Sequence, residues 1–464
     1  MLSQSDVIEL VRDRLYPLFK AERERLAWLD LWMHWEHEPI DLPANASREQ
    51  RNLRDLARTP WLGLVVASTS QAQVVDGFRS PDQLENSTAW AIWERNRFGA
   101  KQHPIHYAAN GYGYCYGKAV PGEINGERRA RLTAVDPSHA IAVYADELED
   151  EWPAYVLHGR PYGSTWLMKL YDDEYEYIVS VGSDGGDVEF IEWRQHAVGV
   201  TPFVRYAPFQ DLKGRAVGEV EPFINLAKRL NKNVHDRLLA QHYNSWKIRT
   251  ASGIDLGKGL KEPGPDSSPD EWARYAAEIE KRRIRLGQSD MLVARDPNTK
   301  FSTLDETPLE GFVRVDESDQ KTLAAVSQTP ITAFAELSNV SADTIAEIRN
   351  GWAQKVAMRC AGMADGHAQL LRLGAHIEGD DAAANDFRSR ITWQDLQIRS
   401  LSQAADGLGK IAQMLQVPVQ ALWPLIPGVE KADVDEWKQI AAEGDALTGL
   451  AGLLNEQAAD EPSF

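Results

Sequence analysis

Two histidines, His34 and His37, lie three residues apart in the segment His-Trp-Glu-His-Glu near the N-terminus. On a helix this spacing places both imidazoles on one side, where they could bind a metal ion such as zinc. The segment is neither the His-Glu-x-x-His motif of zinc enzymes nor its inversion. The alternative is a polar and aromatic helix face, and we interpret the segment in this way.

Other residue types with reactive side chains also lack the spacing that chemistry requires. Residues 253–258 read Gly-Ile-Asp-Leu-Gly-Lys, which has the wrong spacing for a phosphate-binding loop and no Ser or Thr after the Lys. This segment predicts a turn. The chain has no Gly-x-Ser-x-Gly and no Cys-x-x-Cys. We therefore expect no catalytic residues, no cofactor and no enzyme activity.

Carboxylates are plentiful, and their densest run contains Asp146, Glu147, Glu149, Asp150 and Glu151. Calcium binding is one reading of such a run. In an acidic protein the other reading is a solvated turn, which we favour. The sequence therefore predicts no metal site.

Composition describes a large protein of ordinary globular type. The 464 residues are 43% hydrophobic and 26% charged, which allows two to four domains with a sizeable core. The 15 tryptophans are core residues or subunit contacts. Two cysteines, no signal peptide and no apolar run of membrane-spanning length predict a protein of the reducing cytoplasm.

The charge balance limits the ways in which the protein could meet nucleic acid. A net charge of −19 argues against a broad phosphate-gripping face, because that affinity comes from Lys and Arg clusters. It does not exclude DNA as cargo, since a channel that lets duplex slide should repel it weakly. An acidic protein that is merely soluble is the alternative explanation.

The N-terminal half predicts helices followed by a β-rich region. Helix is expected over 5–35, divided by Pro17, then helix running into strand over 52–78 and helix over 90–97. After Pro104 the tyrosines and glycines are typical of strands and turns. Residues 127–159 predict strands joined by a Val-Asp-Pro turn and an acidic turn. Two further hairpin segments around a loop at 182–186 would complete a sheet of about six strands.

The second half is organised around long helices. Residues 202–246 contain a turn of sequence Gly-Arg-Ala-Val-Gly-Glu at 214–219, then an amphipathic helix. Residues 245–306 predict short strands over 246–250, 290–296 and 300–306 and one helix. Ser268 is its N-cap, with Pro269 at the first helical position and Glu271 at the third, as in a capping box. A helix over 308–328, a break at Pro330 and a long helix after Ser341 follow. Residues 391–441 read as helix, turn, helix, with a Leu-Ile-Pro-Gly turn at 425–428.

These segments, in this order, resemble the portal proteins of tailed bacteriophages, of the long-tailed type. The Gly-Arg-x-x-Gly-Glu turn before a long helix, the strand-Asp-Pro-strand segment, the Pro-broken helix pair and the Leu-Pro-Gly turn carry the resemblance. It implies an α+β portal fold. Its parts would be a wing of N-terminal helices and mixed β-sheet (1–222), a first stem helix (223–245), an α/β clip (246–306), a second stem helix (307–329), a tunnel loop (330–340), a long wing helix and return (341–394), and a crown with C-terminal tail (395–464).

The resemblance also implies a function and partners. We expect a homo-oligomeric ring, usually a dodecamer, at one capsid vertex, which conducts double-stranded DNA during packaging and ejection. Terminase, the major capsid protein and a neck or adaptor protein would bind it, with no membrane involved. It would be found in the virion and, during assembly, in the host cytoplasm. Another virion protein, such as a neck or minor capsid protein, and a packaging-motor enzyme subunit are the alternatives.

Site residues follow from the same resemblance. The implied DNA-facing residues of the tunnel loop are Thr332, Phe334, Glu336, Ser338 and Asn339. The implied channel acids of the stem are Glu310, Asp316, Glu317 and Asp319. The clip strands are expected beside Trp246 and Phe301.

Overall fold

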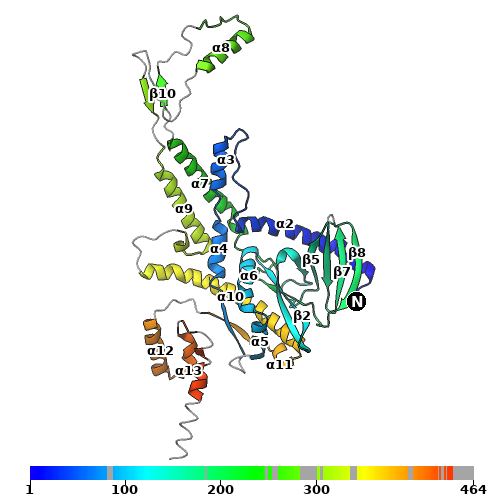
Figure 1. Cartoon of the computed structure of the whole chain (residues 1–464). Helices are drawn as coiled ribbons and strands as arrows, with labels where there is room; N and C mark the ends of the chain where they lie inside the picture. The colour runs from blue at the N-terminus through cyan, green and yellow to red at the C-terminus, as the bar shows by residue number, and fades with distance from the viewer. Residues whose placement is uncertain are drawn as a thin grey trace, which may run out of the picture.

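The computed structural model has an α+β fold, as predicted, in which a broad body carries a long two-helix projection (Figure 1). The structure describes residues 1–80, 87–182, 185–245, 249–252, 260–282, 300–303, 307–334, 342–394, 401–426, 428–429, 433–434 and 436–442. A small α/β tip lies at the far end of the projection. A helical segment lies on the opposite side of the body.

The N-terminal helix is continuous where a division at Pro17 was predicted. It runs through α1 (Gln4–Glu9), a π-helical stretch (Leu10–Leu15) and α2 (Tyr16–Met33). In the π stretch the Tyr16 N–H donates to the carbonyl of Val11, five residues back. Pro17, which has no N–H to donate, falls in the first turn of α2, where an interior helical bond is not required. The helix therefore widens locally and does not break.

The strands between Cys115 and Tyr206 form two antiparallel sheets where one mixed sheet of about six strands was predicted. The first, in the order β3-β2-β9, contains β2 (Cys115–Ile124), β3 (Glu127–Val135) and β9 (Phe203–Tyr206). The second runs in sequence order through β4 (Ala140–Val143), β5 (Tyr155–Tyr162), β6 (Thr165–Tyr171), β7 (Tyr175–Gly182) and β8 (Val188–Gln195). Short connections such as the one at Gly163 allow only antiparallel neighbours.

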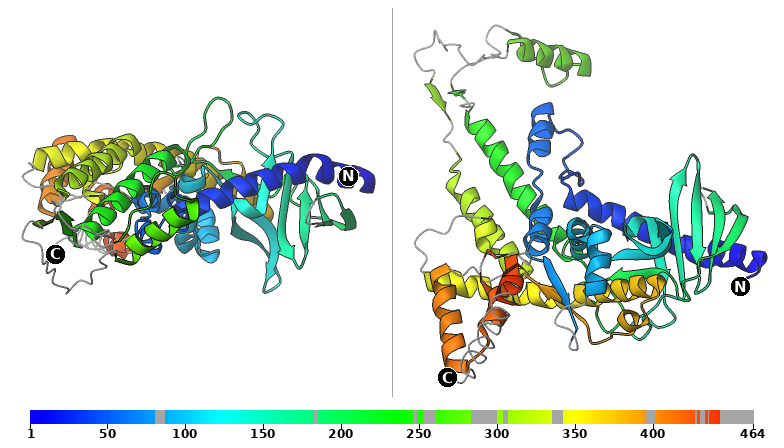
Figure 2. Two further views of the ribbon diagram at one scale, coloured as in Figure 1. Left: turned by 90° about the horizontal axis from the view of Figure 1, so that it is seen from above. Right: turned by 60° about the horizontal axis from the view of Figure 1, so that its bottom comes forward.

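A turn at Pro137–His139 carries the chain from the first sheet to the second. The N-terminal helix lies across the five-stranded sheet with its first part, at the end of the body away from the projection (Figure 2), and the end of α2 packs near α4 and α7. Val7, Val11 and Leu15 are fully buried against Leu170 and other side chains of that sheet. The helix and the five-stranded sheet therefore share one hydrophobic core.

The first part of the segment after Pro104 is helical where strands were predicted, and the strand β2 begins only at Cys115. Helix α6 (Phe98–Tyr112) contains Pro104 and ends at Gly113, whose φ of +104° is a left-handed conformation that favours glycine. Ile105 and Ala109 are buried four residues apart on one face of α6. Burial of this face in the core outweighs the hydrogen bond that Pro104 removes.

The remaining helices of the body pack on α6 or on the long helix α10 (Ala342–Glu378). They are α4 (Trp61–Ser70), α5 (Ser87–Arg95) and α11 (Asp381–Ala384), whereas α3 (Arg48–Leu56) lies beside α7 of the projection (Figure 1). The helix-to-strand segment predicted over 52–78 is thus two helices, separated before Trp61, followed by β1 (Val75–Arg79). β1 pairs with β12 (Arg390–Trp393). Helix α10 passes under the first sheet, and its Leu370, Leu371 and Leu373 lie in the largest core cluster.

The projection is a helical hairpin. It consists of α7 (Ile224–Ser245) and α9 (Glu310–Ser327), with short 3-10 turns at Glu221–Phe223 and Ile331–Ala333 next to it. At its tip lie β10 (Arg249–Ser252), α8 (Pro269–Arg282) and β11 (Lys300–Thr303). On the other side of the body lie α12 (Leu401–Leu415), α13 (Val419–Leu422) and a 3-10 turn at Trp423–Leu425.

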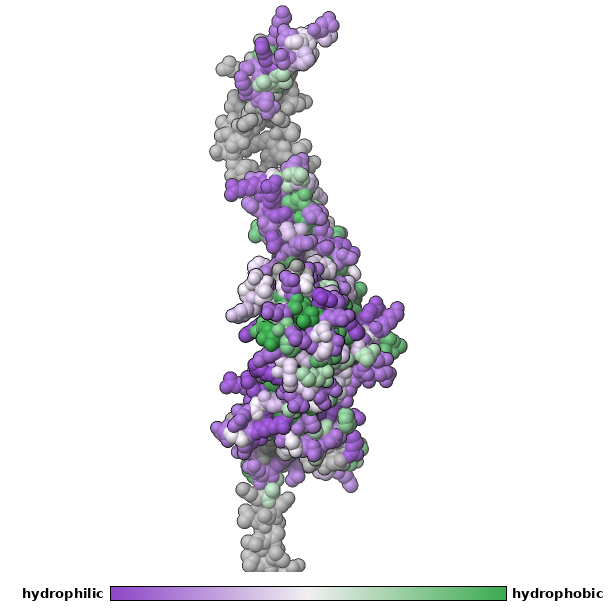
Figure 3. Space-filling model, turned by 90° about the vertical axis from the view of Figure 1, so that its right-hand side faces the viewer, coloured by the Kyte–Doolittle hydropathy of each residue, from purple (hydrophilic) through white to green (hydrophobic). Residues whose placement is uncertain are grey.

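The surface is mostly hydrophilic along the projection, and Figure 3 shows hydrophobic residues gathered at mid-height of the face that carries the N-terminus. The exposed side of α9 mixes charged and polar residues with the exposed valines Val313, Val315 and Val326. We refer to the hairpin of α7 and α9 as the stem from here on.

A chain of hydrogen bonds crosses the core between α6 and α10. His106 Nδ1 lies 2.8 Å from the Gln73 carbonyl, His106 Nε2 lies 2.8 Å from His367 Nε2, and His367 Nδ1 lies 3.1 Å from the Tyr206 hydroxyl. A carbonyl only accepts, so His106 donates there. With both rings neutral, His367 donates to His106 and Tyr206 donates to His367. Burial lowers the pKa of His106 to about 4 and lowers that of His367 further below its ordinary range.

This arrangement predicts a loss of stability in acid. Unfolded histidine titrates near pH 6.5, so below that pH the unfolded chain binds more protons than the folded chain. Stability should fall as the pH drops from about 6.5 towards 4, by up to ~1.4 kcal/mol per pH unit for each ring. Urea unfolding of the wild type and of His367→Gln at several pH values would measure this slope.

The exposed His103 on the same helix α6 provides the matched control. His367→Gln should show a shallower dependence on pH over this range, whereas His103→Gln should keep the wild-type slope. An unchanged slope in His367→Gln would show that the buried pair does not set the acid sensitivity.

Candidate functional site

The turn that precedes the stem requires glycine at two positions. A Cβ on Gly218 would lie 2.0 Å from the carbonyl oxygen of Gly111. A Cβ on Gly113, which also has a positive φ, would lie 2.3 Å from the carbonyl oxygen of Ala216. The chain entering the stem thus lies directly against the end of α6, backbone to backbone. This contact explains the glycine before Glu219 in the Gly-Arg-Ala-Val-Gly-Glu turn.

Glu219 is the buried ionic centre of this junction, with 3% of its surface exposed. Its N–H donates to the Asn110 carbonyl at 2.7 Å. One carboxylate oxygen accepts from Lys355 Nζ at 2.9 Å and from the Thr69 hydroxyl at 3.0 Å. The other lies 3.5 Å from Arg359 Nε, an ion pair without a hydrogen bond.

Lys355 extends the network to the end of the stem. Its ammonium also donates to the Ser327 carbonyl, the last residue of α9, at 2.8 Å. Burial lowers the pKa of Lys355, and the neighbouring Glu219 carboxylate opposes that shift. Glu219 and Lys355 together tie α4, α6, the start of the stem, the end of the stem and α10 to one point. The sequence contains the turn, but only the fold shows that its glutamate pairs with a lysine 136 residues later.

The predicted stem acids separate into two pairs. Asp319 is buried between the stem helices, where it accepts from Asn233 at 2.5 Å and forms an ion pair with Arg229 at 2.7 Å. Asp316 is half-buried and accepts from Gln320 at 3.0 Å; burial raises its pKa. Asp319 is thus engaged by α7, whereas the hydrogen bond of Asp316 stays within α9. That these two acids influence a channel stays a prediction.

Glu310 and Glu317 are exposed on α9, with Glu310 4.0 Å from Arg314, and their place in a channel also stays a prediction. At the far end of the stem, Asn244 and Thr307 exchange hydrogen bonds of 2.7 and 3.1 Å. The hairpin is thus joined at both ends and by Asp319 within it.

The segment after the stem is partly described. Thr332 lies exposed in the 3-10 turn. Phe334 packs against Trp61, with ring centres 6.3 Å apart, and against the core cluster of α2, α4 and α7. Phe334 was predicted to face DNA, yet its apolar ring packs against the protein's own core. Glu336, Ser338, Asn339 and the Ser341 cap lie outside the described residues.

The tip of the stem contains the predicted strands and helix in part. β10 and β11 pair antiparallel, with Phe301 opposite Ala251. Ser268 and Glu271 form the predicted capping box at the start of α8. Trp246, the strand predicted over 290–296 and the Gly-Ile-Asp-Leu-Gly-Lys segment lie outside the described residues.

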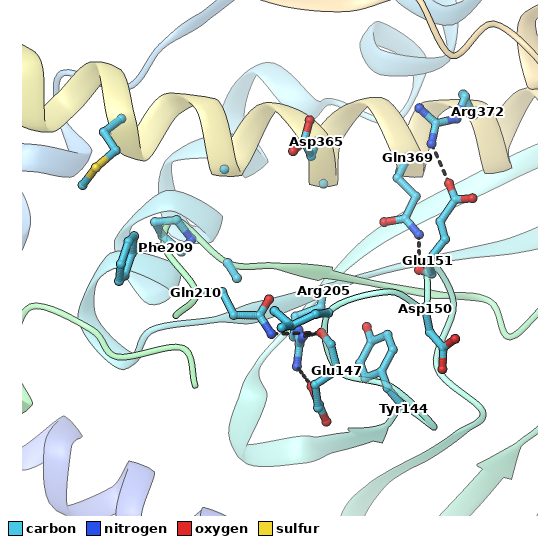
Figure 4. Close-up of a pocket in the computed structure, with 16 residues that line it drawn as sticks. Tyr144, Glu147, Asp150, Glu151, Arg205, Phe209, Gln210, Asp365, Gln369 and Arg372 are labelled. Atoms are coloured by element: carbon cyan, nitrogen blue, oxygen red, sulfur yellow. Dashed lines mark hydrogen bonds and ion pairs between the residues drawn. The ribbon is translucent and has the colours of Figure 1, made fainter. Parts of the chain in front are cut away.

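The acidic run borders a cleft of about 560 Å³ between the 144–151 segment, the chain after β9, and α10 (Figure 4). Arg205 pairs with Glu147 at 2.6 Å, and Arg372 pairs with Glu151 at 2.6 Å. Asp146 and Asp150 accept hydrogen bonds from the backbone of their own turn. These carboxylates therefore hold a turn against α10, in agreement with the turn reading.

The two N-terminal histidines do not form a pair. Helix α2 ends at Met33, and Trp35 has a φ of +63°, so the helix that would align the imidazoles is absent. His34 contacts Asp30, whereas His37 is buried, stacks on Trp32 and contacts Asn231 at 2.8 Å. Within the described ranges, no group of three or more His, Cys, Asp or Glu side chains could hold a metal ion.

Removing the charge of Glu219 should destabilise the protein strongly. Glu219→Ala leaves Lys355 and Arg359 buried without their carboxylate, and breaking a buried ion pair in this way costs about 3–5 kcal/mol. Glu221→Ala is the matched control, because Glu221 is two residues away and its ion pair with Arg25 is partly exposed. The control should lose no more than about 1 kcal/mol. Denaturant unfolding would compare them, and equal losses would contradict the central role of Glu219.

The chain matches the family described as phage portal protein, SPP1 Gp6-like, over residues 16–447. No curated protein matches it.

Two similar solved structures are the neck of an empty gene transfer agent particle computed with C6 symmetry and the virion of a native gene transfer agent particle. Each is 12% identical and covers 84% of this chain and 97% of the other chain, with TM-scores of 0.43 and 0.42. In the described part of the chain, no helix is both long and apolar enough to span a membrane. Phage portal proteins have a structural connector role in an oligomeric ring of a phage particle. The family match covers nearly the whole chain, and the chain therefore belongs to the SPP1 Gp6-like family of phage portal proteins.

Proposed function

We propose that this chain forms a ring at one capsid vertex and conducts double-stranded DNA during genome packaging and ejection. The observation that carries the proposal is the stem, a two-helix hairpin that is tied to the body at both of its chain ends by Glu219 and Lys355. A rigid projection with a small tip domain suits a conduit wall. Copies related by rotation, touching through unlike faces, would close such walls into a ring.

The mechanism we propose is mechanical, without catalysis and without a cofactor. Terminase would bind the tip domain of residues 246–306 during packaging, and a neck or adaptor protein would follow. The body would contact the major capsid protein. The ring would have about twelve copies, as is usual for portals. Assembly would take place in the host cytoplasm, and the finished ring would stay at the portal vertex of the virion.

DNA should pass a wall that repels it weakly. The net charge of −19 supports this, because phosphate affinity needs Lys and Arg clusters. Among the described stem residues, Glu310 and Glu317 are the exposed acids that could line the channel, and Thr332 is the exposed residue at the base. Glu336, Ser338 and Asn339 stay a proposal from the family resemblance.

Ring formation and tip function can be tested separately. Native mass spectrometry of the purified chain should show a large homo-oligomer of about twelve copies, and negative-stain images should show a central hole. Replacing residues 246–306 with a short Gly-Ser linker should keep the body folded and abolish terminase binding in a pull-down. Persistent monomers in the presence of capsid partners, or normal packaging with the linker, would overturn the respective proposal.

The exposed and buried stem acids should differ in what their removal changes. Glu317→Gln should alter stability by no more than about 0.5 kcal/mol, as for other surface substitutions, and should slow DNA translocation in a packaging assay by weakening the repulsion. Asp319→Asn should lose about 1–3 kcal/mol, because Arg229 and Asn233 lose a charged partner. If Glu317→Gln left packaging unchanged while Asp319→Asn rings of normal stability packaged slowly, the assignment would have to be reversed.

A further inference from the structure

A cavity of about 480 Å³ lies between the two sheets of the body. Its lining residues fall between Lys118 and His158, well before the stem in the sequence. Strand pairing explains its lining. Lys118 on β2 is opposite Thr133 on β3, and Val120 is opposite Arg131, so these alternate residues share one face of the three-stranded sheet. His158 on β5 and His139 in the preceding turn line it from the side of the other sheet.

Lys118 is a largely buried cation in this cavity. Its ammonium donates to the Tyr171 hydroxyl at 2.6 Å and lies 4.4 Å from the ring centre of Tyr171 and 5.2 Å from that of Phe203. In the part of the chain that the structure describes, no carboxylate lies within ion-pair distance of it. A buried charge normally has an ionic partner, and this one has a hydroxyl and two aromatic faces.

Two neighbouring groups bring further hydrogen-bond donors to the cavity. His158 Nδ1 is buried and makes no hydrogen bond. Arg131 lines the cavity with an exposed guanidinium, and it forms no ion pair with any described carboxylate. The carboxylate of Asp136 also borders the cavity and accepts from the Ser138 N–H at 2.8 Å, which fixes it to its own turn. The cavity thus contains more hydrogen-bond donors and positive charges than the described acceptors and carboxylates around it pair with.

We propose that this cavity binds the phosphate group of a small molecule, with Lys118 and Arg131 as cations and His158 as a hydrogen-bond donor. A compact oxyanion would accept from several of these donors at once. The volume is that of an ordinary small-molecule pocket. Because Lys118 is recessed between the sheets, a terminal phosphate reaches it, whereas the phosphodiester backbone of a duplex stays at the surface. This site is independent of the DNA conduit.

Binding should depend on the charge of Lys118. Burial, with help from Lys169, lowers the pKa of Lys118 to about 8, while Glu176 opposes the shift. His158 and Arg131 face it across the cavity, and Tyr171 contacts it directly. Since the anion binds the protonated amine, affinity should be highest below pH 8. Above that pH it should weaken by about tenfold per pH unit, the limit for one linked proton.

The first test uses the full chain and inorganic phosphate. At constant ionic strength, phosphate should raise the melting temperature of the wild type relative to chloride, and more at pH 7 than at pH 9.5. Lys118→Met should abolish the rise, and Arg131→Gln, at the exposed rim, should reduce it. Arg128→Gln removes the same charge from the opposite face of β3 and should keep the rise. Equal phosphate effects in all four proteins would mean an adventitious ion only and would overturn the proposal.

The second test does not depend on the folding of a variant. Pyridoxal phosphate carries an aldehyde and a phosphate; its aldehyde condenses with an amine to form an imine and water, and borohydride reduces that imine to a stable secondary amine. Mass spectrometry of the wild type should find Lys118 labelled faster than the exposed Lys213, and inorganic phosphate should protect Lys118 selectively. Protection by duplex DNA at equal phosphate concentration, or no selective labelling of Lys118, would contradict the proposal.

Discussion

A carboxylate with 3% exposure must be paired, and Glu219 is paired by groups from distant parts of the chain. Thr69, Lys355 and Arg359 reach it from α4 and α10, while its own N–H is bonded to the end of α6. Each partner is satisfied only when all these elements are in place. The start and end of the stem are thereby fixed to the same point of the body, and the contacts at that point set the direction in which the stem projects.

The glycines of the junction are a second part of the same constraint. Glu219 can reach its partners because Gly218 lets the chain lie against the end of α6, where any side chain would collide with the Gly111 carbonyl. The ionic network and the backbone contact therefore depend on each other. Most other ion pairs of the body, such as that of Arg215 with Asp211, are partly exposed and contribute about 1 kcal/mol or less.

Sequence patterns predicted the element order well where the hydrophobic period was clear. The stem helices, the capping box at Ser268 and the strands between Glu127 and Tyr162 followed from helical spacing, cap residues and turn signals. The sequence patterns gave wrong predictions near two prolines. Strands and turns were predicted after Pro104, but buried Ile105 and Ala109 hold α6 together. A division was predicted at Pro17, but the helix continues there through a π-helical stretch. Both outcomes depend on tertiary packing, which no local pattern contains.

The position of the stem could be predicted from the sequence, but the contacts made by its acidic side chains could not. Family resemblance located the stem, but whether an acid on α9 faces its partner helix or solvent depends on how α7 and α9 cross. Asp319 pairs with Arg229 across that contact, and Glu317, two residues earlier, is exposed. An acid that already has a cation partner adds little field at a distance, whereas an unpaired exposed acid acts within about 10 Å at moderate salt. The character of any channel wall built from this stem is therefore set by the acids that helix pairing leaves unused.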